Sequence, residues 1–70
     1  MNYKVGETVS VRMFNTPENK FYGPIRTAKI VQIDKNNYSP SGAVLRPYKV
    51  KYIDTGFEGW IASNEIKGRL

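Results

Sequence analysis

Residues 48–62, YKVKYIDTGFEGWIA, decide the fold class of this chain. Tyr48, Val50 and Tyr52 alternate with lysines, and this period of two is typical of a strand with one buried face. The turn-forming triplet Asp-Thr-Gly and then a short apolar run, 59–62, follow this strand. The stretch therefore predicts a β-hairpin.

Upstream, residues 26–33 predict another strand, with an irregular pattern. Ala28 and Ile30 share one face, whereas Val31 and Ile33 fall on the other. A β-bulge near Ile30 and Val31 returns the later pair to the core, and strongly bent barrel strands commonly contain one. We therefore expect a bent strand here.

Two simpler strands are expected nearer the ends of the chain. Val9, Val11 and Met13 share one face of residues 8–13 and alternate with polar residues, as in a half-buried strand. The chain ends in another short strand around Ile66. With the hairpin and the bent strand, this makes five strands and an all-β fold.

The remaining residues are expected to form two long loops and one helical turn. Residues 14–24 and 34–47 are rich in Asn, Gly, Pro and Ser, which favour turns. Long ordered loops in a small domain are commonly functional. Residues 63–65 predict one tight helical turn before the last strand, with Ser63 as its N-cap.

The composition limits what this chain can do. Its 70 residues make one domain, 1–70, near the lower limit for unaided folding. It has no cysteine and no histidine, so disulfides are impossible and the usual zinc ligands are absent. The six carboxylates are scattered among strand ends and turns, without a pair spaced for acid–base catalysis or a metal. We therefore expect a protein that is not an enzyme and holds neither metal nor cofactor.

The charge balance points to an anionic partner. Eleven Lys and Arg residues against six Asp and Glu give a net charge of +5, which favours nucleic acid. The alternative is an ordinary soluble surface, because a few net charges suffice for solubility. No stretch approaches the roughly 20 apolar residues of a membrane span, and the first residues lack the apolar run of a signal peptide. We therefore expect a cytoplasmic protein, or a nuclear one in a eukaryote, that does not contact membranes.

Five short strands, a long first loop and one helical turn before the last strand describe the SH3-like barrel. Within that group the sequence resembles the Tudor and chromo-barrel family. Residues 5–11, VGETVSV, are similar to the opening strand of the family, and 27–33, TAKIVQI, to its second strand. Residues 48–66 are similar to the family's stretch around an Asp-Tyr-Gly turn. The resemblance implies a small five-stranded SH3-like (Tudor-like) barrel with one short 3₁₀ turn before the last strand.

The resemblance also implies an aromatic cage that holds a methylated lysine or arginine by cation–π attraction. In the family its rings come from the first loop, the second strand and the Asp-Tyr-Gly turn. The rings of this chain that match or replace them are Phe21 or Tyr22, Tyr52, and either Phe57 or Trp60 in place of the turn tyrosine. Thr55 stands where the family has the tyrosine of that turn, and this departure counts against a complete cage. The alternative role for Tyr52 is in the core.

The basic residues suggest a second kind of site. Two lysines of the third strand point off one face, beside basic residues of the second strand and of the 34–47 loop. Trp60 faces outward if Ile61 belongs to the core. A positive stripe bordered by rings suits single-stranded nucleic acid, which takes phosphate contacts and base stacking. The expected members are Arg26, Lys29, Lys35, Tyr38, Arg46, Lys49, Lys51 and Trp60. The alternative is a solvated face of separate lysines.

Two functions follow from these patterns. The first is a nucleic-acid-binding module, for DNA or RNA, that uses the stripe. The second is a protein-interaction module, either Tudor-like, gripping a peptide or a modified side chain, or an adaptor or inhibitor that docks through its long loops. Both are binding functions of a monomer, and the first is our leading hypothesis.

Overall fold

Strands dominate residues 3–70, the part of the chain that the computed structural model describes. They are β1 (Thr8–Asn15), β2 (Lys20–Ile33), β3 (Tyr48–Tyr52), β4 (Glu58–Ile61) and β5 (Ile66–Arg69). Within the same range one 3₁₀ turn, η1 (Ser63–Glu65), precedes β5. The all-β fold and the helical turn expected from the sequence are confirmed. No helix in this range is long and apolar enough to cross a membrane.

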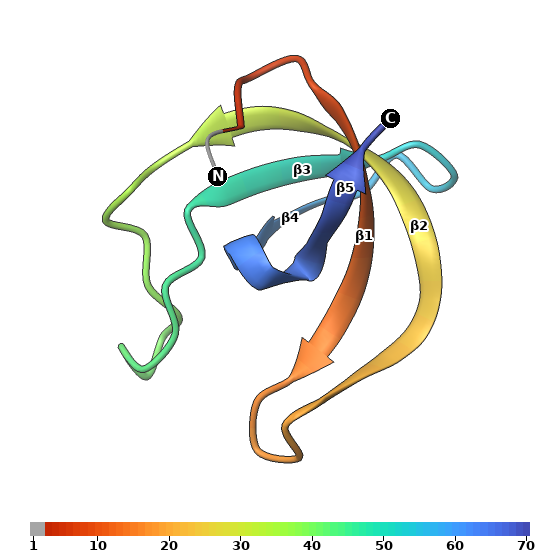
Figure 1. Ribbon diagram of the computed structural model, residues 1–70. Helices are drawn as coiled ribbons and strands as arrows, with labels where there is room; N and C mark the ends of the chain where they lie inside the picture. The colour runs from red at the N-terminus through yellow and green to blue at the C-terminus, as the bar shows by residue number, and fades with distance from the viewer. Residues whose placement is uncertain (1–2) are drawn as a thin grey trace.

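The strands form one antiparallel sheet in the order β4-β3-β2-β1-β5. β2 is the longest strand, and it pairs with β1 over its first part and with β3 over its last part. Figure 1 shows β1 and β2 curving round one side of the molecule while β3 crosses it, so that the sheet wraps around its core. No ladder joins β4 to β5 between residues 3 and 70, and the sheet therefore stays open.

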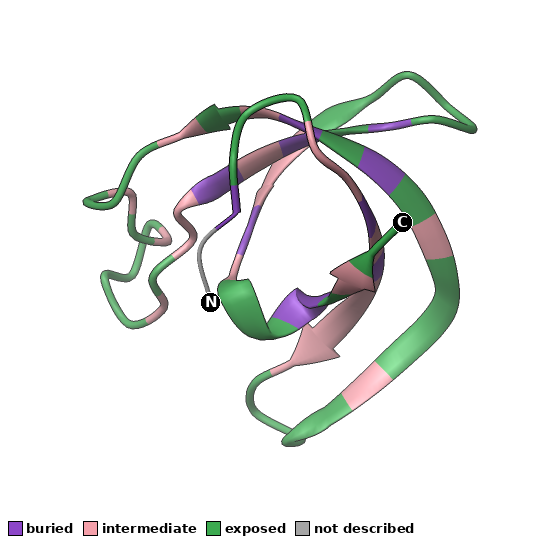
Figure 2. Ribbon diagram, turned by 45° about the horizontal axis from the view of Figure 1, so that its top comes forward, coloured by how far each residue is buried: buried purple, intermediate pink, exposed green. Residues whose placement is uncertain are grey.

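The core is made by residues that alternate inward along these strands. Val9, Val11, Ile30 and Val50 are fully buried, and Figure 2 shows buried bands between more exposed ones along the strands. Around them lie Tyr3, Ala28, Tyr48, Tyr52, Ile61 and Ile66, with Met13 and Ile33 packed against the cluster. The period of two therefore selects the core residues, as expected.

The bulge expected in the second strand is present in β2. Ile30 pairs with Val50, but the preceding residue of β3 pairs with Gln32, so Val31 is the extra residue. This insertion returns Ile33 to the core, against which it packs. The expectation that Val31 joins the core as well is wrong, because Val31 is itself the extra residue and stays half-buried. The insertion also leaves Gln32 facing outward, on the same side as the lysines of β3.

The long first loop expected at 14–24 is mostly strand, and that expectation is wrong. β1 and β2 extend through this segment and leave only a turn at 16–19. Gly23 has a φ of 74° and lies where the β1–β2 register shifts, a conformation that favours glycine. The turn-forming residues of this segment act locally, and pairing with the neighbouring strand overrides them.

The second loop, 34–47, contains no long strand but is organised by hydrogen bonds. An isolated bridge joins Tyr38 to Leu45. Next to it the Arg46 N–H donates to the Asn37 carbonyl at 2.7 Å. Figure 2 shows mostly exposed or half-buried residues along this segment, which leads from β2 into β3.

The helical turn η1 has a different cap from the one expected. Ser63 is exposed, and the cap position is taken by Ala62, which has no side-chain acceptor. Instead, Glu65 Oε1 accepts a hydrogen bond from the Ala62 N–H at 2.9 Å, and Oε2 accepts one from the Phe14 N–H at 3.0 Å. The assignment of Ser63 as the cap is therefore wrong, because one longer carboxylate reaches both donors and ties η1 to β1.

Candidate nucleic-acid interface

Three lysines occupy the outward face of β2 and β3. Lys29 and Lys51 are direct cross-strand partners, and such partners project from the same face of a sheet. Lys49 lies on that face too, because it alternates with the buried residues of β3. On β4, Trp60 is the cross-strand partner of Lys49. We call Lys29, Lys49, Lys51 and Trp60 the lysine face.

Three of the six carboxylates form ion pairs with basic residues outside the lysine face. Ion pairs join Glu7 to Arg69, Glu18 to Lys20 and Asp54 to Arg26. Glu58 is the direct cross-strand partner of Lys51, and its Oε1 lies 3.4 Å from the Lys49 Nζ. Lys29 and Lys51 form no ion pair with any residue between 3 and 70. The face therefore keeps an excess of positive charge.

Trp60 is less exposed than the sequence suggests. Ile61 belongs to the core, as expected, but Trp60 is half-buried although it lies on the outward side. Cross-strand neighbours cover part of a ring as large as indole when it lies on a sheet. One part of its surface remains accessible beside Lys49.

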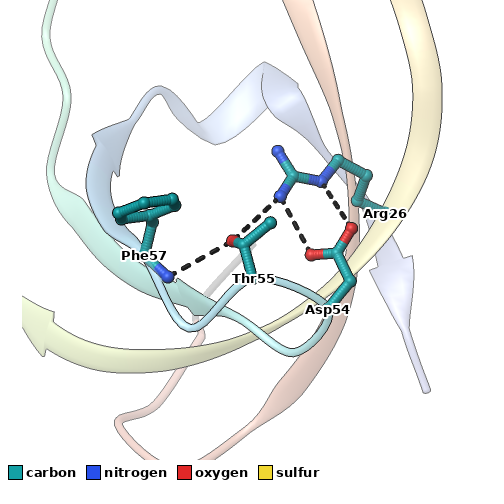
Figure 3. A network of polar contacts seen from close by, with 4 residues as sticks. All are labelled: Arg26, Asp54, Thr55 and Phe57. Atoms are coloured by element: carbon teal, nitrogen blue, oxygen red, sulfur yellow. Dashed lines mark hydrogen bonds and ion pairs between the residues drawn. The ribbon is translucent and has the colours of Figure 1, made fainter.

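Arg26 lies on the other face of β2. It is the cross-strand partner of the buried Val11, and its guanidinium lies 3.9 Å from the centroid of the Tyr52 ring. Figure 3 shows the same guanidinium contacting Asp54 and Thr55. Its Nη2 lies 2.9 Å from Asp54 Oδ1 and 3.3 Å from Thr55 Oγ1, and its Nε lies 3.3 Å from Asp54 Oδ2. Arg26 is thus separated from the lysine face and engaged within the chain.

This bidentate contact also changes the acidity of both partners. The hydrogen bonds to Asp54 raise the pKa of Arg26, and the hydrogen bonds from Arg26 lower the pKa of Asp54. Both side chains therefore stay charged over a wider pH range than free ones.

The other residues expected in the stripe belong to the 34–47 segment. Lys35 and Tyr38 are exposed there, and Arg46 is half-buried. Lys35 lines a hollow that also includes Tyr3, whereas Arg46 lines a different one that includes Tyr22. The sheet brings together only the lysine face, and these three residues lie on the segment that follows β2.

The rings expected to form an aromatic cage do not all share one face. Phe21 and Tyr22 are consecutive residues of β2, so their side chains point to opposite faces. Phe21 packs edge-on against Phe14, with 4.9 Å between ring centroids. Its ring also carries the Lys67 ammonium at 3.6 Å. Phe21 is therefore engaged by neighbours on β1 and β5.

The other two rings of the expected cage differ sharply in exposure. Tyr52 is buried beneath Arg26, and this burial raises the pKa of its hydroxyl. Phe57 is 74% exposed and follows the β3–β4 turn. The guanidinium of Arg26 thus already lies over the face of the Tyr52 ring that a methylated cation would use.

The sequence does not predict two features near these residues. One is the buried carboxylate of Glu65, which accepts hydrogen bonds from the backbone N–H groups of Phe14 and Ala62. The other is a cleft between the β1–β2 hairpin and the 34–47 segment, lined by Tyr22 and Arg46 among others. The aromatic and basic residues of both segments were visible in the sequence, but which of them meet depends on how the segments pass each other.

No group of three or more His, Cys, Asp or Glu side chains in residues 3–70 is placed to hold a metal ion. Comparisons of the chain with models of protein families, with curated proteins and with solved structures found no match.

Proposed function

We propose that this protein is a small non-catalytic module that binds nucleic acid through the lysine face. The pair formed by Lys29 and Lys51 carries this proposal. Like charges directly opposite each other on neighbouring strands destabilise a sheet. Between residues 3 and 70 neither lysine forms an ion pair, although Glu58 lies opposite Lys51 on β4. A phosphate backbone supplies the missing negative charge, and release of its counterions supplies affinity.

The other groups on this face suit a single strand. Trp60 offers part of an indole ring beside Lys49, and stacking of bases on such rings tolerates any sequence. Thr8 lies opposite Lys29, and Gln32 lies opposite Lys49. Hydroxyl and amide side chains of this kind contact phosphate and sugar. Both DNA and RNA present these groups.

We infer that the fold belongs to the SH3-like barrels. The order of five strands, with one 3₁₀ turn between β4 and β5, supports this assignment. The curvature of β2, which pairs with a different neighbour at each end, supports it as well (Figure 1). The sheet lacks a ladder between its edge strands, so the assignment depends on element order and curvature.

A Tudor-like protein-interaction module is the second candidate. Tyr52 and the exposed Phe57 stand where the resemblance expects rings of a cage. However, an external methylated cation has to displace Arg26 from Tyr52 and break its contacts with Asp54. This cost ranks the second candidate below nucleic-acid binding.

An NMR titration tests the proposal. Isotope-labelled protein is titrated at low salt with a short single-stranded DNA, with an RNA of the same sequence and with a trimethyl-lysine peptide. We expect at least one nucleic acid to shift the amide signals of Lys29, Lys49 and Lys51 and the indole signal of Trp60. If neither nucleic acid shifts them, the proposal fails. Shifts caused by the peptide at Tyr52 and Phe57 support the second candidate instead.

A further inference from the structure

A cleft of about 430 Å³ opens between the β1–β2 hairpin and the 34–47 segment. Its size falls within the range of about 300–1,000 Å³ typical of small-molecule sites. Its apolar and aromatic walls are Phe14, Pro17 and Tyr22 on the hairpin and Ala43 and Val44 on the segment. None of the residues of the lysine face lines it, so it is a separate site.

Arg46 is the one charged residue among those that line this cleft. It is half-buried, and its guanidinium has no ion pair, hydrogen bond or ring contact with residues 3–70. Its backbone is held on both sides by Asn37, because the Arg46 N–H donates to the Asn37 carbonyl and the Arg46 carbonyl accepts from Asn37 Nδ2 at 2.9 Å. The guanidinium of a half-buried arginine on a fixed backbone, with no ion pair between residues 3 and 70, is complementary to an anion.

Tyr22 provides an accessible ring in the same cleft. It is 51% exposed, whereas its neighbour Phe21 is packed against Phe14 and Lys67. No ring or cation between residues 3 and 70 stacks on Tyr22. A flat ligand can therefore use this ring without displacing a contact of the chain.

The second hollow beside the 34–47 segment lacks this combination. It measures about 530 Å³ and contains Tyr3 and Tyr48. These two rings pack edge-on against each other, with 5.5 Å between centroids, and both are buried. They offer no free face for stacking.

We propose that the cleft binds one nucleotide unit, with Arg46 on the phosphate and Tyr22 stacked on the base. An anion joined to a flat ring matches the only charge and the most accessible ring among the lining residues. The ligand is either a free nucleotide or a nucleotide within a strand. In the second case the inference rests on the proposed function, because the same strand then contacts the lysine face.

The test is an NMR titration with deoxyadenosine monophosphate and, separately, with deoxyadenosine. We expect the nucleotide to shift the amide signals of Tyr22 and Arg46, and the nucleoside to bind about tenfold more weakly. Arg46→Gln weakens nucleotide binding about tenfold, and Tyr22→Ala weakens it at least about fivefold. Tyr22→Phe keeps the ring and retains binding.

Matched controls come from the same segment. Lys35→Gln removes an exposed cation and Tyr38→Ala an exposed ring, and neither residue lines the cleft, so both variants bind the nucleotide like the wild type. A deoxyadenosine hexamer separates the two sources of the ligand. If the hexamer binds the cleft more tightly, the ligand is a nucleotide within a strand. If the mononucleotide binds more tightly, the ligand is a free nucleotide.

The inference is overturned if the nucleotide leaves the cleft signals unchanged, or if the nucleoside binds as tightly as the nucleotide. Binding of a short acidic peptide in the cleft, with no response to nucleotides, overturns it as well. These failures differ from failure of the proposed function. If the amide signals of the cleft do not shift but those of Lys29 and Lys51 do, only the inference fails. If the signals of the lysine face do not shift but those of the cleft do, only the proposed function fails.

Discussion

Lys29 and Lys51 illustrate how a surface residue can serve binding at the expense of stability. They are cross-strand partners of equal charge, and neither has an ion pair within residues 3–70. Repulsion between them lowers the free energy of unfolding, and a bound phosphate relieves that repulsion. At this pair, the arrangement that favours binding of nucleic acid therefore lowers the free energy of unfolding.

Replacing one lysine of the pair should separate these two effects. We expect Lys29→Gln to raise the free energy of unfolding by about 0.2–1 kcal/mol, because it removes the like-charge contact and its other cross-strand partner is the uncharged Thr8. The same variant should bind nucleic acid more weakly. Urea unfolding and a binding titration measure the two effects. Lower stability of Lys29→Gln would contradict the account of the pair.

The Arg26–Asp54 pair predicts a dependence of stability on pH. The hydrogen bonds from Arg26 lower the pKa of Asp54 in the folded chain, so the unfolded chain binds more protons between the lowered and the ordinary value. The stabilising contribution is therefore fully present above the ordinary pKa of about 3.9 and is lost as the pH falls through the lowered pKa. The effect is small, because Asp54 is exposed.

Two substitutions should change this loss of stability at low pH in the same way. We expect Asp54→Asn and Arg26→Gln each to flatten the fall in unfolding free energy between pH 5 and pH 2, roughly the range over which such a carboxylate titrates. The double variant should flatten it no further, because either change removes the same interaction. Urea unfolding at several pH values measures this. Additive effects of the two changes would show that the pair does not cause the pH dependence.

At the scale of elements, the sequence predicts the features that follow from the alternation of buried and exposed side chains along a strand. Val9, Val11, Val50 and their neighbours are buried because a pleated strand sends alternate side chains to opposite faces. The bulge at Val31 was predictable by the same logic, since the apolar pattern changes face within one strand. Local residue patterns suffice for such features.

Features that depend on contacts between distant segments were not predictable. The segment 14–24 has the composition of a loop, yet it forms a hairpin because β1 and β2 pair through it. Ser63 is a good cap residue, yet Glu65 takes over this role because its longer side chain also reaches Phe14. In both cases a partner remote in sequence decides the outcome.

Glu65 should consequently be a main source of stability at the junction of η1 and β1. It is only 4% exposed and accepts hydrogen bonds from the Ala62 and Phe14 N–H groups. Because Glu65→Ala leaves both donors without a partner, we expect it to lower the free energy of unfolding by about 2–4 kcal/mol. The exposed Asn64 provides the control, and Asn64→Ala should change it by less than about 0.5 kcal/mol. Equal effects of both substitutions in urea unfolding would contradict this role.

At the scale of the whole molecule, the net charge of +5 is unevenly compensated. Arg26, Lys20 and Lys49 form ion pairs with carboxylates, whereas Lys29 and Lys51 form none between residues 3 and 70. The composition predicts an anionic partner but not where it binds. The lysine face follows from alternation along two neighbouring strands.

The separation of Arg26 from Lys29 follows from the same alternation, because the two positions differ by an odd number of residues and lie on opposite faces of β2. Other parts of the candidate site were beyond the reach of the sequence. Arg46 and Tyr22 meet because the 34–47 segment passes beside the first hairpin. Strand period alone describes neither the orientation of that segment nor its neighbours.

Salt-dependent binding of single-stranded DNA tests the central claim most directly. Fluorescence anisotropy compares the wild type with Lys29→Gln/Lys51→Gln and with Lys20→Gln/Lys67→Gln. The second variant loses the same charge from lysines that already contact Glu18 and Phe21. We predict that only the first variant binds more weakly, with a plot of log affinity against log salt that is less steep by about 0.7 for each lost phosphate contact. Equal weakening of both variants, or no detectable binding by the wild type at low salt, would contradict the claim.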